Sequence, residues 1–123
     1  MGVSESKPIL IVDDVNTMIR VLRNLLRQLG FTQIDEACDG ATALAKMRAK
    51  DYALVISDTH MAPMSGLELM AAARADERTS ATPFIILGDE DQSATRAGAA
   101  ACLIAPFSAQ MLRAKLEPVL GAI

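Results

Sequence analysis

Aromatic residues and long apolar runs are both scarce in this chain of 123 residues, which has no tryptophan, one tyrosine and three phenylalanines. With so little aromatic bulk, the core must be built from Leu, Ile, Val, Ala and Met. No apolar run approaches the roughly 20 residues of a membrane-spanning helix, and residues 1–7 contain no apolar segment of the signal-peptide kind. We therefore expect a cytoplasmic protein with no membrane partner.

Cysteine and an excess of positive charge are also lacking. The two cysteines, Cys38 and Cys102, lie far apart and form no CxxC motif, which is typical of free thiols in a reducing compartment. The net charge of −3, with scattered lysines and arginines, argues against nucleic acid as a partner. The length suits one core, so we expect residues 1–7 to form a polar tail and residues 8–123 to form a single domain.

Short apolar runs alternate with helical patterns along the chain. We expect strands at 9–12, 34–38, 54–57, 84–87 and 101–104. Helical patterns cover 18–29, 41–50, a segment that begins at Gly66 and a segment that follows an N-cap at Ser108. Strands that alternate with helices predict an α/β protein with a doubly wound parallel sheet, whose ligands bind beyond the carboxyl ends of the strands.

Three aspartates stand at two of these strand ends. Asp13 and Asp14 directly follow the apolar run 9–12, and Asp58 follows the run that ends at Ser57. If the two strands are parallel neighbours, the three carboxylates meet at one edge of the sheet, where like charges repel unless a cation joins them. Such a cluster suits a hard divalent ion with oxygen ligands, and it leaves one carboxylate as a possible nucleophile.

The chain resembles response-regulator receiver domains over nearly its whole length, and most of all the single-domain chemotaxis regulators of the CheY kind. The residues that carry the resemblance are the pair Asp13-Asp14, Asp58, then Met61 and Gly66 in the following loop, and Ala105-Pro106-Phe107 after the last strand. The resemblance implies a flavodoxin-like, five-stranded parallel sheet. Its strand order of 2-1-3-4-5 is the known order of CheY, not a deduction from these residues.

The resemblance also implies a reaction and a role in signalling. Asp58 would accept a phosphoryl group from a histidine kinase or phosphotransfer protein, and the chain would then act on a downstream protein target, not as an enzyme. Asp14, Asp58 and the backbone carbonyl of His60 would ligate Mg²⁺, with Asp13 helping directly or through water. The peptide bond between Ala105 and Pro106 is expected to be cis, as such bonds are essentially confined to proline.

Four departures from the family pattern concern the phosphoryl group and the response to it. Ala105 replaces a lysine, Gly88 replaces a threonine or serine at the end of the fourth strand, and Cys102 replaces a tyrosine or phenylalanine. The segment between Gly88 and Gly98 is too short for the family's fourth helix and allows about two turns at most.

These departures leave a second function open. The chain is either an atypical phospho-accepting receiver or a pseudo-receiver that acts as an adaptor or dimerisation module without phosphorylation. The face formed by residues 89–97, the strand at 101–104 and the last helix is expected to bind a protein or a second copy of the chain. A phosphatase of the haloacid dehalogenase type ranks far lower, because His60 stands where its acid catalyst would be.

Overall fold

The structure is a computed structural model that describes residues 7–88, 98–104 and 106–121. These residues form, in chain order, β1 (Ile9–Val12), α1 (Asn16–Gln28), β2 (Ile34–Ala37), α2 (Gly40–Ala49), β3 (Leu54–Asp58), α3 (Gly66–Arg74), β4 (Phe84–Leu87), β5 (Ala101–Leu103) and α5 (Ala109–Leu120). The predicted alternation of strands and helices is confirmed. The shortened fourth helix, predicted within residues 89–97, lies outside the described residues.

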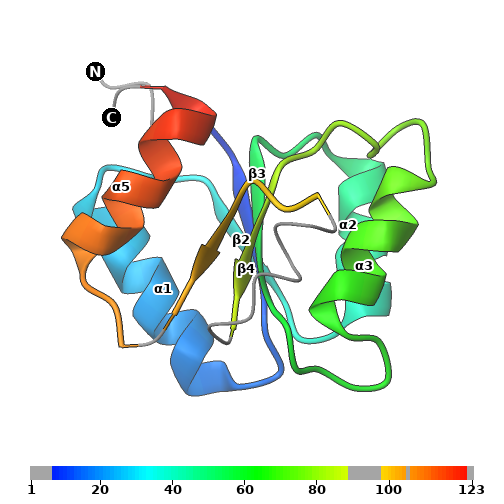
Figure 1. The fold of residues 1–123 in the computed structure, drawn as a ribbon, viewed down its shortest axis with the longest axis horizontal. Coiled ribbons are helices and arrows are strands. Elements are labelled where there is room, and N and C mark those ends of the chain that lie inside the picture. Colours follow the sequence, from blue (N-terminus) through cyan, green and yellow to red (C-terminus); the bar gives the residue numbers. More distant parts are fainter. Residues whose placement is uncertain (1–6, 89–97, 105, 122–123) are drawn as a thin grey trace.

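The strands form one parallel sheet in the order β2-β1-β3-β4-β5, as the family resemblance predicted. Helices α1 and α5 cover one face of this sheet and α2 and α3 cover the other (Figure 1). Because every strand runs in the same direction, the carboxyl ends of β1 and β3 lie at the same edge. That edge is where an α/β sheet binds its ligands.

The core is aliphatic, as the composition predicted, and it has two halves separated by the sheet. Along β1 every residue is fully buried, and the side chains alternate between the faces. Ile9 and Ile11 pack in the half that includes α1 and α5. Leu10 and Val12 pack in the half that includes α2 and α3. Burial on both faces explains why this strand is a continuous apolar run in the sequence.

Polar side chains fix where the helices begin. The Asp39 carboxylate accepts a 2.7 Å hydrogen bond from the backbone N–H of Thr42 at the start of α2. Ser65 and Glu68 form a reciprocal capping box at the start of α3. The predicted cap at Ser108 is confirmed, because its hydroxyl accepts a hydrogen bond from the backbone N–H of Met111.

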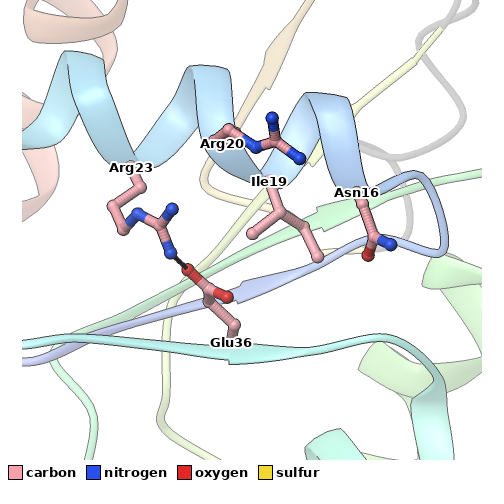
Figure 2. Close-up of a pocket in the computed structure, with 5 residues that line it drawn as sticks. All are labelled: Asn16, Ile19, Arg20, Arg23 and Glu36. Carbon is pink, nitrogen blue, oxygen red and sulfur yellow. Dashed lines mark hydrogen bonds and ion pairs between the residues drawn. The ribbon is translucent and has the colours of Figure 1, made fainter.

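Helix α1 is tied to the edge strand β2 by an ion pair between Arg23 and Glu36 (Figure 2). The two residues line a hollow of about 210 Å³ together with Asn16, Ile19 and Arg20. Both charged side chains are partly exposed, so the pair contributes less than about 1 kcal/mol to stability. None of the helices in the described ranges has the length and apolar character needed to cross a bilayer.

Candidate functional site

The three aspartates converge at the carboxyl edge of the sheet, as the sequence predicted. Strands β1 and β3 are parallel neighbours, with Val12 beside Ser57, so the residues that follow each strand emerge together. Asp13, Asp14 and Asp58 each offer a carboxylate oxygen, and these oxygens all lie within 4.8 Å of one another. This spacing is close enough for one small cation to contact all three groups.

Asp13 is the buried member of the cluster, with only 2% of its surface exposed. Its carboxylate accepts a 2.9 Å hydrogen bond from the backbone N–H of Val15, which fixes its orientation. Burial raises the pKa of Asp13 from its ordinary value of 3.8 to about 6, against the effect of the Val15 hydrogen bond, and the charges of Asp58 and Asp14 add to the rise. At neutral pH the folded protein therefore carries a buried negative charge on Asp13 that lowers its stability.

Asp58 is half-buried at the end of β3. Burial is the largest cause that raises the pKa of its carboxyl group, and the charge of Asp14 adds to it. Hydrogen bonds from the backbone N–H groups of His60 and Thr59 act in the opposite direction. The carboxylate is thus next to donors that stabilise negative charge, while its open side stays accessible from solvent.

The loop from Thr59 to Ser65 folds back onto Asp58 and requires glycine at position 66. The backbone N–H of Gly66 donates a 3.0 Å hydrogen bond to the carbonyl of Thr59. A Cβ atom on Gly66 would lie 2.1 Å from the carbonyl oxygen of Asp58, which is too close for any other residue. Gly66 therefore allows the start of α3 to press against the strand end that carries Asp58.

The cluster fits a hard divalent cation such as Mg²⁺. Its donors are carboxylate oxygens, the ligand type that Mg²⁺ prefers. Within the described ranges, none of the ion pairs formed by lysine or arginine involves Asp13, Asp14 or Asp58. Burial is the largest cause of the raised pKa of Asp13, and a cation would offset the smaller contribution of the Asp58 and Asp14 charges.

The positions that depart from the family pattern lie along β4 and β5. Gly88 directly follows β4, and its backbone N–H donates to the carbonyl of Leu103 in β5. Cys102 is half-buried in β5, where it packs against the half of the core that includes α2 and α3. The structure brings these two positions to neighbouring strands, whereas Ala105 lies outside the described residues.

Two features near the site were not predicted. Thr59 donates from its hydroxyl to the carbonyl of Leu87 across the β3–β4 boundary, at 2.7 Å. A cis peptide bond joins Ala62 to Pro63, whereas the predicted cis bond before Pro106 involves a residue outside the described part of the chain. The only sequence signal for this contact is that a threonine directly follows Asp58. That signal can be interpreted only once the pairing of β3 with β4 is known.

Comparison with known proteins decides the family. The response regulator receiver domain matches residues 9–117 of the chain. The chain belongs to this family. CheY-like receiver domains are signalling proteins of two-component systems. The solved receiver domain of the sensor histidine kinase PA1611 from Pseudomonas aeruginosa, which is 24% identical to this chain, has a magnesium ion coordinated in its active-site cleft.

The relatives of this receiver domain include chemotaxis regulators. It is 42% identical over 116 residues to the chemotaxis protein CheY of Pseudomonas aeruginosa, covering 90% of this chain and 94% of that protein. The solved structure of the chemotaxis response regulator CheY4 of Vibrio cholerae superimposes with a TM-score of 0.83 at 28% identity, covering 93% of this chain and 98% of that one. A CheY-like receiver domain from Methylobacillus flagellatus gives 0.82 at 26% identity, with coverage of 92% and 98%.

Proposed function

We propose that this receiver domain accepts a phosphoryl group on Asp58 from a histidine kinase or phosphotransfer protein, with Mg²⁺ bound beside it, and signals through protein contacts. The observation that supports this most directly is the approach of the Asp13, Asp14 and Asp58 oxygens to within 4.8 Å of one another. Residues 8–123 would act as one signalling domain, and residues 1–7 would be a tail.

The proposed reaction transfers the phosphoryl group between two side chains. A carboxylate oxygen of Asp58 forms a bond to phosphorus while the P–N bond of the donor phosphohistidine breaks. The electron pair of that bond stays on the imidazole nitrogen, and the product on Asp58 is a mixed anhydride. The backbone N–H groups of Thr59 and His60 lie beside the carboxylate, where they hold its orientation.

The acidic cluster would hold the metal. Asp13, Asp14 and Asp58 provide carboxylate oxygens, and we assign the backbone carbonyl of His60 as a further ligand from the family resemblance. When bound, Mg²⁺ neutralises charge between the carboxylates and the incoming phosphoryl oxygens. The hydrogen bond from the backbone N–H of Val15 fixes the orientation of the Asp13 carboxylate whether or not the metal is bound.

The departures at Ala105, Gly88 and Cys102 define how this receiver would differ from its relatives. Loss of one positioned cationic donor typically costs about 3 kcal/mol in a transition state, so alanine at 105 predicts slow phosphorylation. The half-buried thiol of Cys102 is too small to reproduce the movement of an aromatic ring. The phosphorylated state would therefore be communicated by other groups.

An apolar surface near β5 and α5 is the proposed contact for a downstream protein or for a second copy of the chain. Ile104 and Met111 are large apolar side chains that are 42% and 46% exposed there. Apolar side chains in such a position favour association with a protein partner. Sedimentation velocity with and without a phosphodonor tests the second copy, since a monomer under both conditions contradicts it.

The direct test is phosphorylation in solution. The protein is incubated with Mg²⁺ and acetyl phosphate, and intact mass spectrometry is used to detect one added phosphoryl group. We expect the addition in the wild type and in Asp51→Ala, a control at an exposed carboxylate, and no addition in Asp58→Ala. An unmodified wild type would contradict the proposal and favour the alternative, a pseudo-receiver that binds partners without phosphate.

A further inference from the structure

The space beside Gly88 is filled by the side chain of Thr59. Asp58 and Leu87, the last residues of β3 and β4, are paired in the sheet. The residues that directly follow them, Thr59 and Gly88, therefore also lie side by side. A Cβ atom placed on Gly88 would come within 2.3 Å of the Thr59 hydroxyl oxygen. The Thr59 hydroxyl therefore occupies the place where a side chain at position 88 would begin.

The backbone at Gly88 does not require glycine, whereas the contact with Thr59 favours it. The glycines of the described chain with positive φ are Gly30, Gly98 and Gly121, so the backbone at Gly88 suits other residues. A larger residue would place its Cβ atom 2.3 Å from the Thr59 hydroxyl oxygen, so one of the two groups would have to move. A side chain at 88 would therefore require the Thr59 hydroxyl to leave its present position.

The Thr59 hydroxyl is held in place by a second, independent contact. Both the backbone N–H and the hydroxyl of Thr59 donate to the carbonyl oxygen of Leu87, at 2.9 Å and 2.7 Å. The hydroxyl is thus fixed at the end of β4, on the residue directly after Asp58. This is the sheet edge where the family places the hydroxyl of its missing threonine or serine.

From this arrangement we infer that Thr59 supplies the hydroxyl that donates a hydrogen bond to the phosphoryl group on Asp58, in place of the side chain absent at Gly88. The inference rests on the proposed function, because it requires a phosphoryl group on Asp58. The hydroxyl comes from the strand that carries the acceptor instead of the neighbouring strand.

The exchange of hydrogen-bond partners is favourable. In the protein without phosphate, the Thr59 hydroxyl donates to a neutral carbonyl, whereas a phosphoryl oxygen is charged and forms a hydrogen bond about twice as strong. When the hydroxyl turns away, the Leu87 carbonyl keeps the hydrogen bond from the Thr59 backbone N–H. No buried acceptor is left without a partner, so the movement carries little penalty.

The same movement connects the acceptor to β5. Loss of the hydroxyl bond loosens the end of β4 at Leu87, and the next residue, Gly88, donates to the Leu103 carbonyl of β5 at 3.1 Å. These bonds form a continuous path from Asp58 to the strand that contains Cys102. The path gives this receiver a response that does not require an aromatic ring in β5.

The first test separates the hydroxyl from the shape of the side chain. Thr59→Val keeps the shape and removes the hydroxyl, while Thr59→Ser keeps the hydroxyl; Thr32→Val, at an exposed residue away from the site, is the matched control. With saturating Mg²⁺ and acetyl phosphate, we expect Thr59→Val to slow phosphorylation of Asp58 roughly ten- to a hundredfold, the effect of losing a hydrogen bond to a charged group. Thr59→Ser and the control should stay within about threefold of the wild type on the same scale.

The second test moves the hydroxyl back to position 88. Gly88→Thr alone should lower the melting temperature because of the contact with Thr59. Gly88→Thr combined with Thr59→Ala should recover both the melting temperature and most of the phosphorylation rate. Recovery of the rate by a hydroxyl on the other strand is a result that a purely structural role for Thr59 would not produce.

The outcomes distinguish this inference from the proposed function. A wild type that is phosphorylated, together with a Thr59→Val variant that reacts at the same rate, overturns the inference alone. The same conclusion follows if Thr59→Ser is as slow as Thr59→Val, since shape would then be the cause. A wild type that takes up no phosphoryl group overturns both.

Discussion

Replacing Asp13 with asparagine removes a buried charge while it keeps the shape of the side chain. The asparagine Oδ1 atom can still accept the hydrogen bond that Val15 donates to Asp13. In the wild type, the pKa of Asp13 is about 6, above its ordinary 3.8. A raised pKa means that the folded state binds the proton more tightly, so stability is highest below pH 3.8 and is lost as the pH rises through about 6.

The size of the effect follows from the same values. At about 1.4 kcal/mol per pH unit, the rise from 3.8 to about 6 corresponds to at most about 3 kcal/mol of lost stability. Because asparagine also has a cost when it is buried, we expect Asp13→Asn to raise the free energy of unfolding by about 1–3 kcal/mol at pH 7.5 without divalent ions. The gain should vanish near pH 4, where the wild-type carboxyl group is protonated in the folded state.

Urea denaturation in EDTA between pH 4 and pH 8 measures this difference. Asp51→Asn is the control, because its carboxylate is exposed and pairs only at 3.5 Å with Arg78. Addition of Mg²⁺ should stabilise the wild type through binding to the native state, and should stabilise Asp13→Asn much less. An Asp13→Asn variant that is no more stable than the wild type in EDTA at pH 7.5 would refute the reasoning about the cost of the buried charge. Equal stabilisation of both proteins by Mg²⁺ would refute the role of Asp13 in the metal site.

Three further substitutions test a partly buried hydrogen bond, a glycine beside Asp58 and a helix cap. The Tyr52 hydroxyl donates to Asp35 at 2.6 Å and is the largest cause that lowers the pKa of Asp35; Tyr52→Phe should raise that pKa in an NMR titration. It should also remove stability that the wild type has above pH 3.8 and loses as the pH falls through the lowered value. Gly66→Ala should destabilise the fold by about 1–3 kcal/mol in urea denaturation, because its Cβ would crowd Asp58. Asp39→Ala should lower the stability in the same assay through loss of the α2 cap.

The sheet and its carboxylate edge could be predicted from the sequence because both depend on local signals. A four-residue apolar run such as Ile9–Val12 is typical of a strand that is buried on both faces of a parallel sheet. The end of such a run marks the edge of the sheet, so Asp13 and Asp58 could be placed together before the structure was known. Ser108 could be predicted as a cap for the same reason, since a cap needs only the neighbouring backbone.

The different environments of Asp13 and Asp14 could not be predicted, although the two residues are adjacent. Asp13 is buried and Asp14 is exposed, because the chain turns out of the sheet between them. That turn depends on the Val15 N–H reaching back to the Asp13 carboxylate, which is a contact in space and leaves no pattern in the sequence. Hence the sequence predicted the cluster but not which carboxylate would be buried, and the structure shows that it is Asp13, whose pKa burial raises.

The relation between Thr59 and Gly88 shows why comparison of single positions is not enough to judge an atypical receiver. Taken alone, glycine at 88 removes a hydroxyl from the family pattern. In space, the hydroxyl of Thr59 lies 2.3 Å from the place where the Cβ atom of such a side chain would be, so the hydroxyl would have to move to admit it. If Thr59 contacts the phosphoryl group, as we infer, the hydroxyl lost directly after β4 is replaced by one directly after β3. Only the parallel register that places Asp58 beside Leu87 reveals this exchange.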